Sequence, residues 1–302
     1  MKRNYFAVSI IIFLVLAGLT IFISLRQKQF SQSPPNSDKL QVTTSFYPLY
    51  FMAAEIGGDK AEITNITPAG AEPHAYELTA RDIAQIENSR LLIINGGGLE
   101  PWSSNIQQNI NPAKTITGVA GENLSDRPDP HFWLSPPLAK KMVDNIFQGF
   151  TAADSSNQNY YKTNADFLKT RLDNLDNEYK NGLADCTQKN IVTAHEAFGY
   201  LAAAYGFNQI AIAGLSPEAE PSPKQLAEIA QLAKAKDLKY IFFESLASPK
   251  LAETLAAEIK AETLVLNPIE GLTNEELAQG KDYFTEMRAN LVNLQTALQC
   301  KK

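Results

Sequence analysis

Short apolar runs of strand length alternate with amphipathic runs of helix length from residue 41 onward. In the first half of the chain, β-rich runs at 41–46, 62–66 and 91–95 are separated by helical runs at 47–58 and 79–89. Regular alternation of strands and helices predicts parallel βαβ units, in which each helix returns the chain to the same end of the sheet.

The second half repeats this alternation. Strands are expected at 190–195, 209–214, 239–245 and 263–267, and helices at 197–206, 222–237, 248–261 and 274–298. Because these strand runs are almost continuously apolar, we expect them to be buried on both faces, as in a parallel sheet covered by helices.

A single long helix is predicted between the two halves. The segment 157–183 contains no proline and carries apolar residues at spacings of three to four, namely Phe167, Leu168, Leu172, Leu175, Tyr179 and Leu183. The predicted fold class is therefore α/β, with two lobes around central parallel sheets joined by one long rigid helix. The expected boundaries are a first lobe at 40–153, a linking helix at 154–184 and a second lobe at 185–302.

The amino-terminal segment predicts export. Residues 6–25 are twenty consecutive uncharged, mostly apolar residues between basic flanks, which is long enough to span a bilayer. We interpret 1–28 as an uncleaved membrane anchor, with a cleaved export signal as the alternative. Residues 29–39 are rich in Ser, Gln and Pro and are expected to form a tether. Either alternative places the folded part outside the cytoplasm.

The composition of the chain excludes some classes of ligand. The 302-residue chain has a net charge of −6 and no Lys/Arg cluster, so it is a poor candidate for binding nucleic acid. Two cysteines exclude a four-cysteine zinc site within the chain. In an oxidising compartment, Cys186 and Cys300 could form one disulfide, but the sequence leaves their proximity open.

The only three histidines are placed where ligands bind in α/β folds. His195 ends a predicted strand, His74 follows another in a Pro-marked loop, and His131 lies in the Pro-marked run DPHFWLSP. Ligands of open α/β sheets bind beyond the carboxyl ends of the strands. Three imidazoles and one carboxylate would make a closed tetrahedral site that favours Zn²⁺.

Several motifs then carry a family resemblance across about residues 41–300. They are GAEPHAYELTARDI, LIINGGGLEPW, DPHFWLSP, TAHEAFGYLAAAYG, GLSPEAEPSPKQL, FFE and LNPIEGL. In this order they resemble the cluster A-I substrate-binding proteins of ABC importers for zinc and manganese. The resemblance implies two α/β lobes with a metal site in the cleft between them, with His74 and His131 as first-lobe ligands and His195 as a second-lobe ligand.

The resemblance also bears on the fourth ligand and on the metal. The run NPIEGL resembles the zinc-specific branch of the family and implies Glu270 as the ligand, while Asn267 and Glu72 remain alternatives. Manganese binders of the family carry a carboxylate where His195 stands, and a nitrogen-rich site suits Zn²⁺ better than Mn²⁺. Tyr76, Glu77 and Glu244 are candidates for hydrogen bonds to the imidazoles.

The leading hypothesis is a membrane-attached extracytoplasmic receptor that captures Zn²⁺ and delivers it to an ABC permease and its ATPase. We expect a monomer that catalyses no reaction. A manganese receptor or a metal-dependent adhesin of the same fold is the alternative, and an exported zinc hydrolase is a more distant one. Because imidazoles must be neutral to bind, metal affinity is expected to fall below about pH 6.5.

Overall fold

Two four-stranded parallel sheets form the framework of the chain. The structure, a computed structural model, describes residues 39–219 and 221–301. The first sheet has the order β2-β1-β3-β4, with β1 at Leu40–Thr44, β2 at Ala61–Asn65, β3 at Leu91–Ile94 and β4 at Ile116–Val119. The second has the order β6-β5-β7-β8, with β5 at Asn190–Thr193, β6 at Asn208–Ala211, β7 at Tyr240–Phe243 and β8 at Glu262–Val265. The predicted α/β fold with parallel sheets is confirmed.

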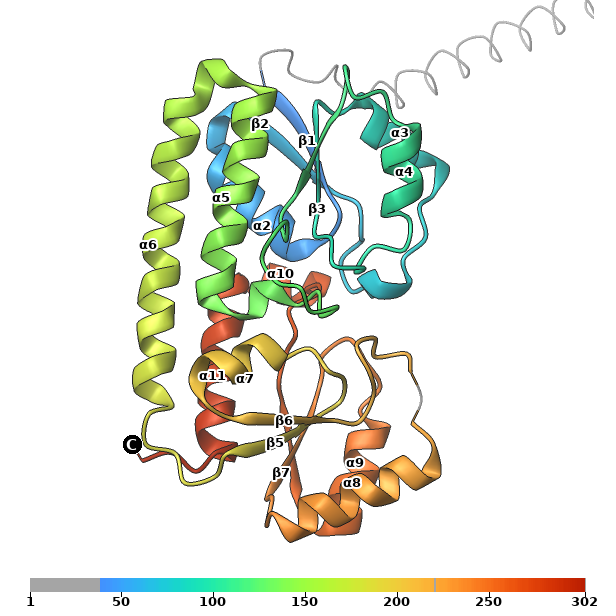
Figure 1. The fold of residues 1–302 in the computed structure, drawn as a ribbon, viewed down its shortest axis with the longest axis vertical. Helices are drawn as coiled ribbons and strands as arrows, with labels where there is room; N and C mark the ends of the chain where they lie inside the picture. Colours follow the sequence, from blue (N-terminus) through green and yellow to red (C-terminus); the bar gives the residue numbers. More distant parts are fainter. Residues whose placement is uncertain (1–38, 220, 302) are drawn as a thin grey trace, which may run out of the picture. The chain divides into compact units, whose positions relative to one another are not determined.

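Helices complete each lobe (Figure 1). The first lobe contains α2 (Tyr47–Gly57), α3 (Ala80–Asn88), α4 (Ser103–Asn109) and α5 (Pro136–Ala153). The second contains α7 (Gly199–Tyr205), α8 (Pro223–Ala235), α9 (Lys250–Ile259), α10 (Asn274–Ala278) and α11 (Tyr283–Ala297). The local sequence determines where several of these helices begin. Thr79 and Ser222 cap α3 and α8 reciprocally with the residue three positions later, which satisfies amides that the first helical turn leaves without partners.

The long helix α6 (Gln158–Gly182) lies where the sequence predicts it, and its backbone runs beside elements of both lobes (Figure 1). Its buried face is Tyr161, Ala165, Leu168, Leu172, Leu175 and Tyr179, a spacing of three to four that packs against α2, α5 and α11. Phe167 was predicted on this face but is 63% exposed, because it lies beside the stripe rather than on it. The Tyr179 hydroxyl donates to the Met287 carbonyl of α11 at 2.6 Å.

Two other sequence expectations are corrected, and three elements were not predicted. The single helix predicted over 274–298 is two helices, because Gly280 adopts a φ of +75° and Asp282 caps a new start at α11. β6 and β8 are not buried on both faces, since they are the edge strands of their sheet. β4, α4 and α5 were not predicted; β4 is short and contains a glycine, which gives little strand signal.

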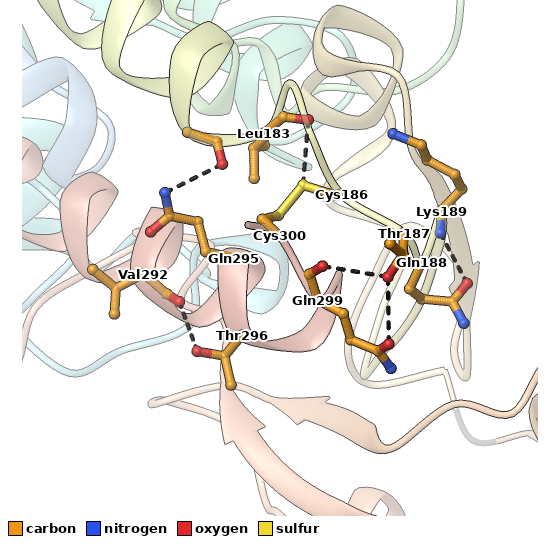
Figure 2. Close-up of a disulfide and its surroundings, with 11 residues drawn as sticks. Leu183, Cys186, Thr187, Gln188, Lys189, Val292, Gln295, Thr296, Gln299 and Cys300 are labelled. Carbon is orange, nitrogen blue, oxygen red and sulfur yellow. Dashed lines mark hydrogen bonds between the residues drawn. A yellow bond between two sulfur atoms is a disulfide. The ribbon is translucent and has the colours of Figure 1, made fainter. Parts of the chain in front are cut away.

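A disulfide joins Cys186, just beyond α6, to Cys300, just beyond α11 (Figure 2). The Gln295 side-chain amide donates to the Gly182 carbonyl, and the Lys301 amide donates to the Asp185 carbonyl. The disulfide that the sequence left open is therefore present, and it lies in a seam of hydrogen bonds between the end of α6 and the end of α11.

The segment at 6–25, predicted to be an anchor, lies outside the described residues. Within residues 39–219 and 221–301, none of the helices is long and apolar enough to cross a bilayer.

Candidate metal centre

The first lobe contributes two histidines at short 3-10 turns. His74 lies in a 3-10 turn (Pro73–Ala75) after β2, and its backbone amide donates to the Glu72 carboxylate at 3.1 Å. His131 precedes the 3-10 turn Phe132–Leu134, and its amide donates to the Asp129 carboxylate at 3.0 Å. In both cases the residue two positions earlier fixes the backbone that carries the imidazole.

The second lobe contributes His195 and Glu270. His195 follows β5 by two residues, and Glu270 lies in the loop after β8. Parallel strands end at the same edge of a sheet, so both side chains emerge at the carboxyl edge where ligands of such sheets bind. The side chains of His131, His195 and Glu270 are almost fully buried, and that of His74 is 8% exposed.

The four side chains named from the sequence converge on one point. The Oε1 atom of Glu270 lies 3.2 Å from Nε2 of His74, 3.3 Å from Nε2 of His131 and 3.4 Å from Nε2 of His195. The Nε2 atom of His131 is 3.3 Å from Nε2 of each of the other two histidines. All four ligand atoms lie within 4.8 Å of one another. Zinc bonds of about 2.0–2.1 Å in an ideal tetrahedron place ligand atoms about 3.3 Å apart, so the five separations of 3.2–3.4 Å match those around a tetrahedral ion.

Two carboxylates orient the buried imidazoles. The Nδ1 atom of His131 lies 2.8 Å from Oδ1 of Asp129, and that of His195 lies 2.6 Å from Oε1 of Glu244. When Nδ1 carries the proton that is donated to the carboxylate, the Nε2 lone pair points to the centre, as metal ligation requires.

Three side chains were expected to form hydrogen bonds with the imidazoles. Glu244 does so, whereas Tyr76 and Glu77 do not. The Tyr76 hydroxyl donates to Asp82 at 2.9 Å, and Glu77 is exposed. Asp129 was missed; its position two residues before His131, like that of Glu72 before His74, is the signal that could have identified it.

Hydrogen bonds within the centre favour an ionised Glu270 and protonated imidazoles. Burial disfavours the charged form of Glu270, but hydrogen bonds to His131, His195 and His74 outweigh it and hold its pKa well below the usual value. Burial also disfavours charged His195, yet its hydrogen bonds to Glu244 and Glu270 raise its pKa to about 10. The pKa of His131 is raised as well, because its hydrogen bonds to Asp129 and Glu270 outweigh burial. The centre therefore attracts positive charge, which a proton or a metal cation can supply.

The two alternative fourth ligands have other partners. Asn267 accepts from the Ile269 amide and donates to Glu286, so both ends of its side chain are engaged. The Glu72 carboxylate accepts a hydrogen bond from the His74 amide. Burial and the nearby charge of Glu270 raise the pKa of Glu72 to about 8. Neither belongs to the group of four converging ligand atoms.

Aromatic side chains surround part of the centre. Phe132, Trp133 and Phe198 are buried, and the Trp133 ring centroid lies 5.3 Å from that of His131. Trp102 lies elsewhere and lines a surface groove with Tyr76. A cavity of about 270 Å³ borders Glu270 and is lined by Tyr47, Tyr50, Asn65, Thr67, Pro68, Ala69, Gly271, Leu272 and Leu277.

The chain has two α/β lobes, each built on a parallel sheet, and both lobes supply side chains to one buried centre. This arrangement defines the class of two-lobed solute-binding receptors. Comparison with known proteins agrees with this class and specifies it further. A family model described as "ZnuA: Zinc-uptake complex component A periplasmic" matches residues 42–297, and the chain belongs to this family. The family consists of solute-binding receptors and is not an enzyme family.

Individual relatives are similar over most of the chain. The "High-affinity zinc uptake system protein ZnuA" of Bacillus subtilis (strain 168) is 38% identical over 284 residues, covering 87% of this chain and 89% of that protein. The "Zinc-binding protein AdcA" of Streptococcus pyogenes serotype M3 is 34% identical over 312 residues, covering 94% of this chain but 60% of that longer protein. The crystal structure of the Zn(II)-bound ZnuA-like domain of Streptococcus pneumoniae AdcA superposes with a TM-score of 0.78 at 38% identity, covering 86% of this chain and 99% of that one.

Proposed function

We propose that this protein is an extracytoplasmic receptor that captures Zn²⁺ and delivers it to an ABC permease for import. The observation that carries the proposal is the spacing of the four ligand atoms. His74, His131, His195 and Glu270 present three imidazole nitrogens and one carboxylate oxygen, and five of the six separations between these atoms are those of a zinc tetrahedron. The names of the relatives support the choice of cargo.

The donor set favours zinc over manganese. Imidazole nitrogen suits Zn²⁺, whereas Mn²⁺ prefers harder oxygen ligands and higher coordination numbers. The single Glu270 carboxylate lowers the charge of a bound divalent ion from +2 to +1. A manganese receptor of the same fold is therefore not favoured.

The same donor set disfavours a hydrolase. Catalytic zinc sites have three protein ligands and leave the fourth position to water. Here the carboxylate of Glu270 occupies that fourth corner, within 3.4 Å of all three imidazoles.

The division of ligands between the lobes supports capture and release. His74 and His131 belong to the first lobe, and His195 and Glu270 follow strands of the second. A small relative shift of the segments would separate ligand atoms and weaken the site, which is what a receptor needs when it docks on a permease.

The remaining parts of the chain are assigned by sequence. We propose that residues 1–28 attach the protein to the membrane, that 29–39 form a tether, and that 40–153, 154–184 and 185–302 are the first lobe, linking helix and second lobe. In this arrangement a monomer holds the ion near the membrane, where the permease and its ATPase take it up.

Metal analysis of the full chain, purified in mild detergent and reconstituted with equal Zn²⁺ and Mn²⁺, tests the proposal. We expect one tightly held zinc per chain, bound more weakly by Glu270→Ala and held as tightly by Glu253→Ala, which changes an exposed glutamate of α9. Preferential binding of manganese would reassign the cargo. Failure of the unmodified chain to bind either metal would overturn the receptor function.

A further inference from the structure

The residue before Glu270 has an unusual backbone conformation. Ile269 has a φ of +57°, in the left-handed region, and its side chain is fully buried. A β-branched residue rarely adopts this conformation, and it persists only where the surrounding structure holds it in place. The contacts of this loop therefore determine where the Glu270 carboxylate points.

Part of the support comes from α11, in the same lobe. The Asn290 side chain accepts from the Asn267 amide at 2.8 Å and donates to the Asn267 carbonyl at 2.7 Å. The Asn267 side chain in turn accepts from the Ile269 amide at 2.8 Å. These hydrogen bonds fix both sides of Pro268, and the Pro268 carbonyl takes part in none of them.

Trp133 of the first lobe supplies that partner. Its indole Nε1–H donates to the Pro268 carbonyl at 2.7 Å, inside a fully buried environment. Trp133 lies two residues after the ligand His131, and Pro268 lies two residues before the ligand Glu270. This hydrogen bond thus joins the segment that carries His131 to the segment that carries Glu270.

The indole is itself held firmly. Its ring packs edge-on against Phe46 at 4.8 Å between centroids, and the Tyr283 hydroxyl donates to the Trp133 carbonyl at 2.5 Å. A donor fixed from several directions can impose a geometry on the loop that it contacts.

We propose that Trp133 is a positioning residue for the carboxylate ligand. By holding the Pro268 carbonyl, its indole N–H keeps Ile269 in the left-handed conformation and directs Glu270 toward the three imidazoles. Without this donor, the buried Pro268 carbonyl lacks a hydrogen bond, which costs free energy and favours a rearranged loop. The inference rests on the proposed metal-binding function and specifies one of its determinants.

The test compares Trp133→Phe with Trp102→Phe, its matched control, in the full chain. Zinc affinity is measured by competition with a chromophoric chelator, and ligand geometry is followed by the visible spectrum of bound Co²⁺. We expect Trp133→Phe to weaken zinc binding by about 10- to 100-fold, the usual effect of removing a group that orients a metal ligand. Its cobalt spectrum should lose the intensity of a tetrahedral site and approach that of Glu270→Ala, while Trp102→Phe changes neither property.

A purely structural role for Trp133 gives a different result. The thermal unfolding temperature of the metal-free variant would then fall, while its zinc affinity and cobalt spectrum stayed unchanged. This result would overturn the proposal. If Trp133→Phe does not fold, 3-benzothienylalanine at position 133 in the Trp102→Phe background keeps the ring size and replaces only the N–H by sulfur. The same spectral change is expected there, and an unchanged spectrum would overturn the proposal. Absence of zinc binding by the unmodified chain would instead refute the proposed function.

Discussion

The Oε1 atom of Glu244 accepts two hydrogen bonds from His195, one from the ring Nδ1 at 2.6 Å and one from the backbone amide at 3.1 Å. The ring and the backbone of this histidine are therefore oriented by a single carboxylate oxygen. Glu244 follows β7 directly, so the sheet itself fixes the distance between the two residues.

Replacing Glu244 with alanine should weaken zinc binding by about 10- to 100-fold, because the His195 ring loses the partner that fixes its tautomer and orientation. Competition with a chelator measures the effect. Glu253→Ala, which removes an exposed carboxylate, is the control and should bind as the unmodified chain does. Equal affinities in all three proteins would show that Glu244 has no part in the site.

Zinc affinity should depend on pH well above the range of an ordinary histidine. In the metal-free protein the His195 pKa is raised to about 10, so at neutral pH this ring carries a proton that zinc must displace. The structure thus moves the pH dependence upward from the value near 6.5 expected from sequence. Apparent affinity should rise about tenfold per pH unit for each proton released, up to about pH 10.

Calorimetry at pH 7.5 in buffers of different ionisation enthalpy counts these protons. We expect at least about one proton released per zinc bound, from His195. Release of none would contradict a protonated His195 in the metal-free centre. The sign follows from the raised pKa, because protonation favours the metal-free state below that pKa and ceases to compete above it.

The helix α6 provides a test of packing with an internal control. Leu172→Ala removes a fully buried side chain and should lower the free energy of unfolding by about 2–5 kcal/mol. Phe167→Ala removes a larger side chain from the same helix, but one that is 63% exposed, and should change it by about 0.5 kcal/mol or less. Urea unfolding of the metal-free proteins measures both, and equal losses would mean that the buried stripe is misassigned.

Removing the disulfide should affect stability and spare the metal centre. Cys186 and Cys300 are 114 residues apart, and closing so long a loop restricts the unfolded chain strongly. The double variant Cys186→Ser with Cys300→Ser should lose about 2–5 kcal/mol in urea unfolding without metal. Zinc affinity should be unchanged at a temperature where the variant is folded. A large loss of affinity with no loss of stability would contradict this separation.

Sequence patterns predicted the elements that depend on local periodicity. The strand and helix alternation, the helix at 157–183 and the placement of His195 after a strand all follow from spacings within a short window. The break at Gly280 was missed because the apolar spacing continues across it, and only the capping by Asp282 shows that a new helix begins.

The four converging side chains of the candidate site were predictable from the sequence, and the residues that support them were not. His74, His131, His195 and Glu270 were named from motifs, and the structure brings them together. The role of Trp133 could not be predicted, because its contact with Pro268 joins residues 135 positions apart, from different lobes. The conformation of Ile269 was equally hidden, since nothing in an isoleucine indicates a positive φ.

The Cys186–Cys300 bond also decides what happens to the second lobe under tension or proteolysis. The chain enters this lobe at one cysteine and leaves it at the other, 114 positions later, so residues 186–300 form a covalent ring that contains His195 and Glu270. A pulling force between the two ends of the chain would pass through the sulfur atoms and leave the ring unstretched. A single protease cut within the ring would release no fragment under oxidising conditions, and both second-lobe ligands would stay attached to the rest of the protein.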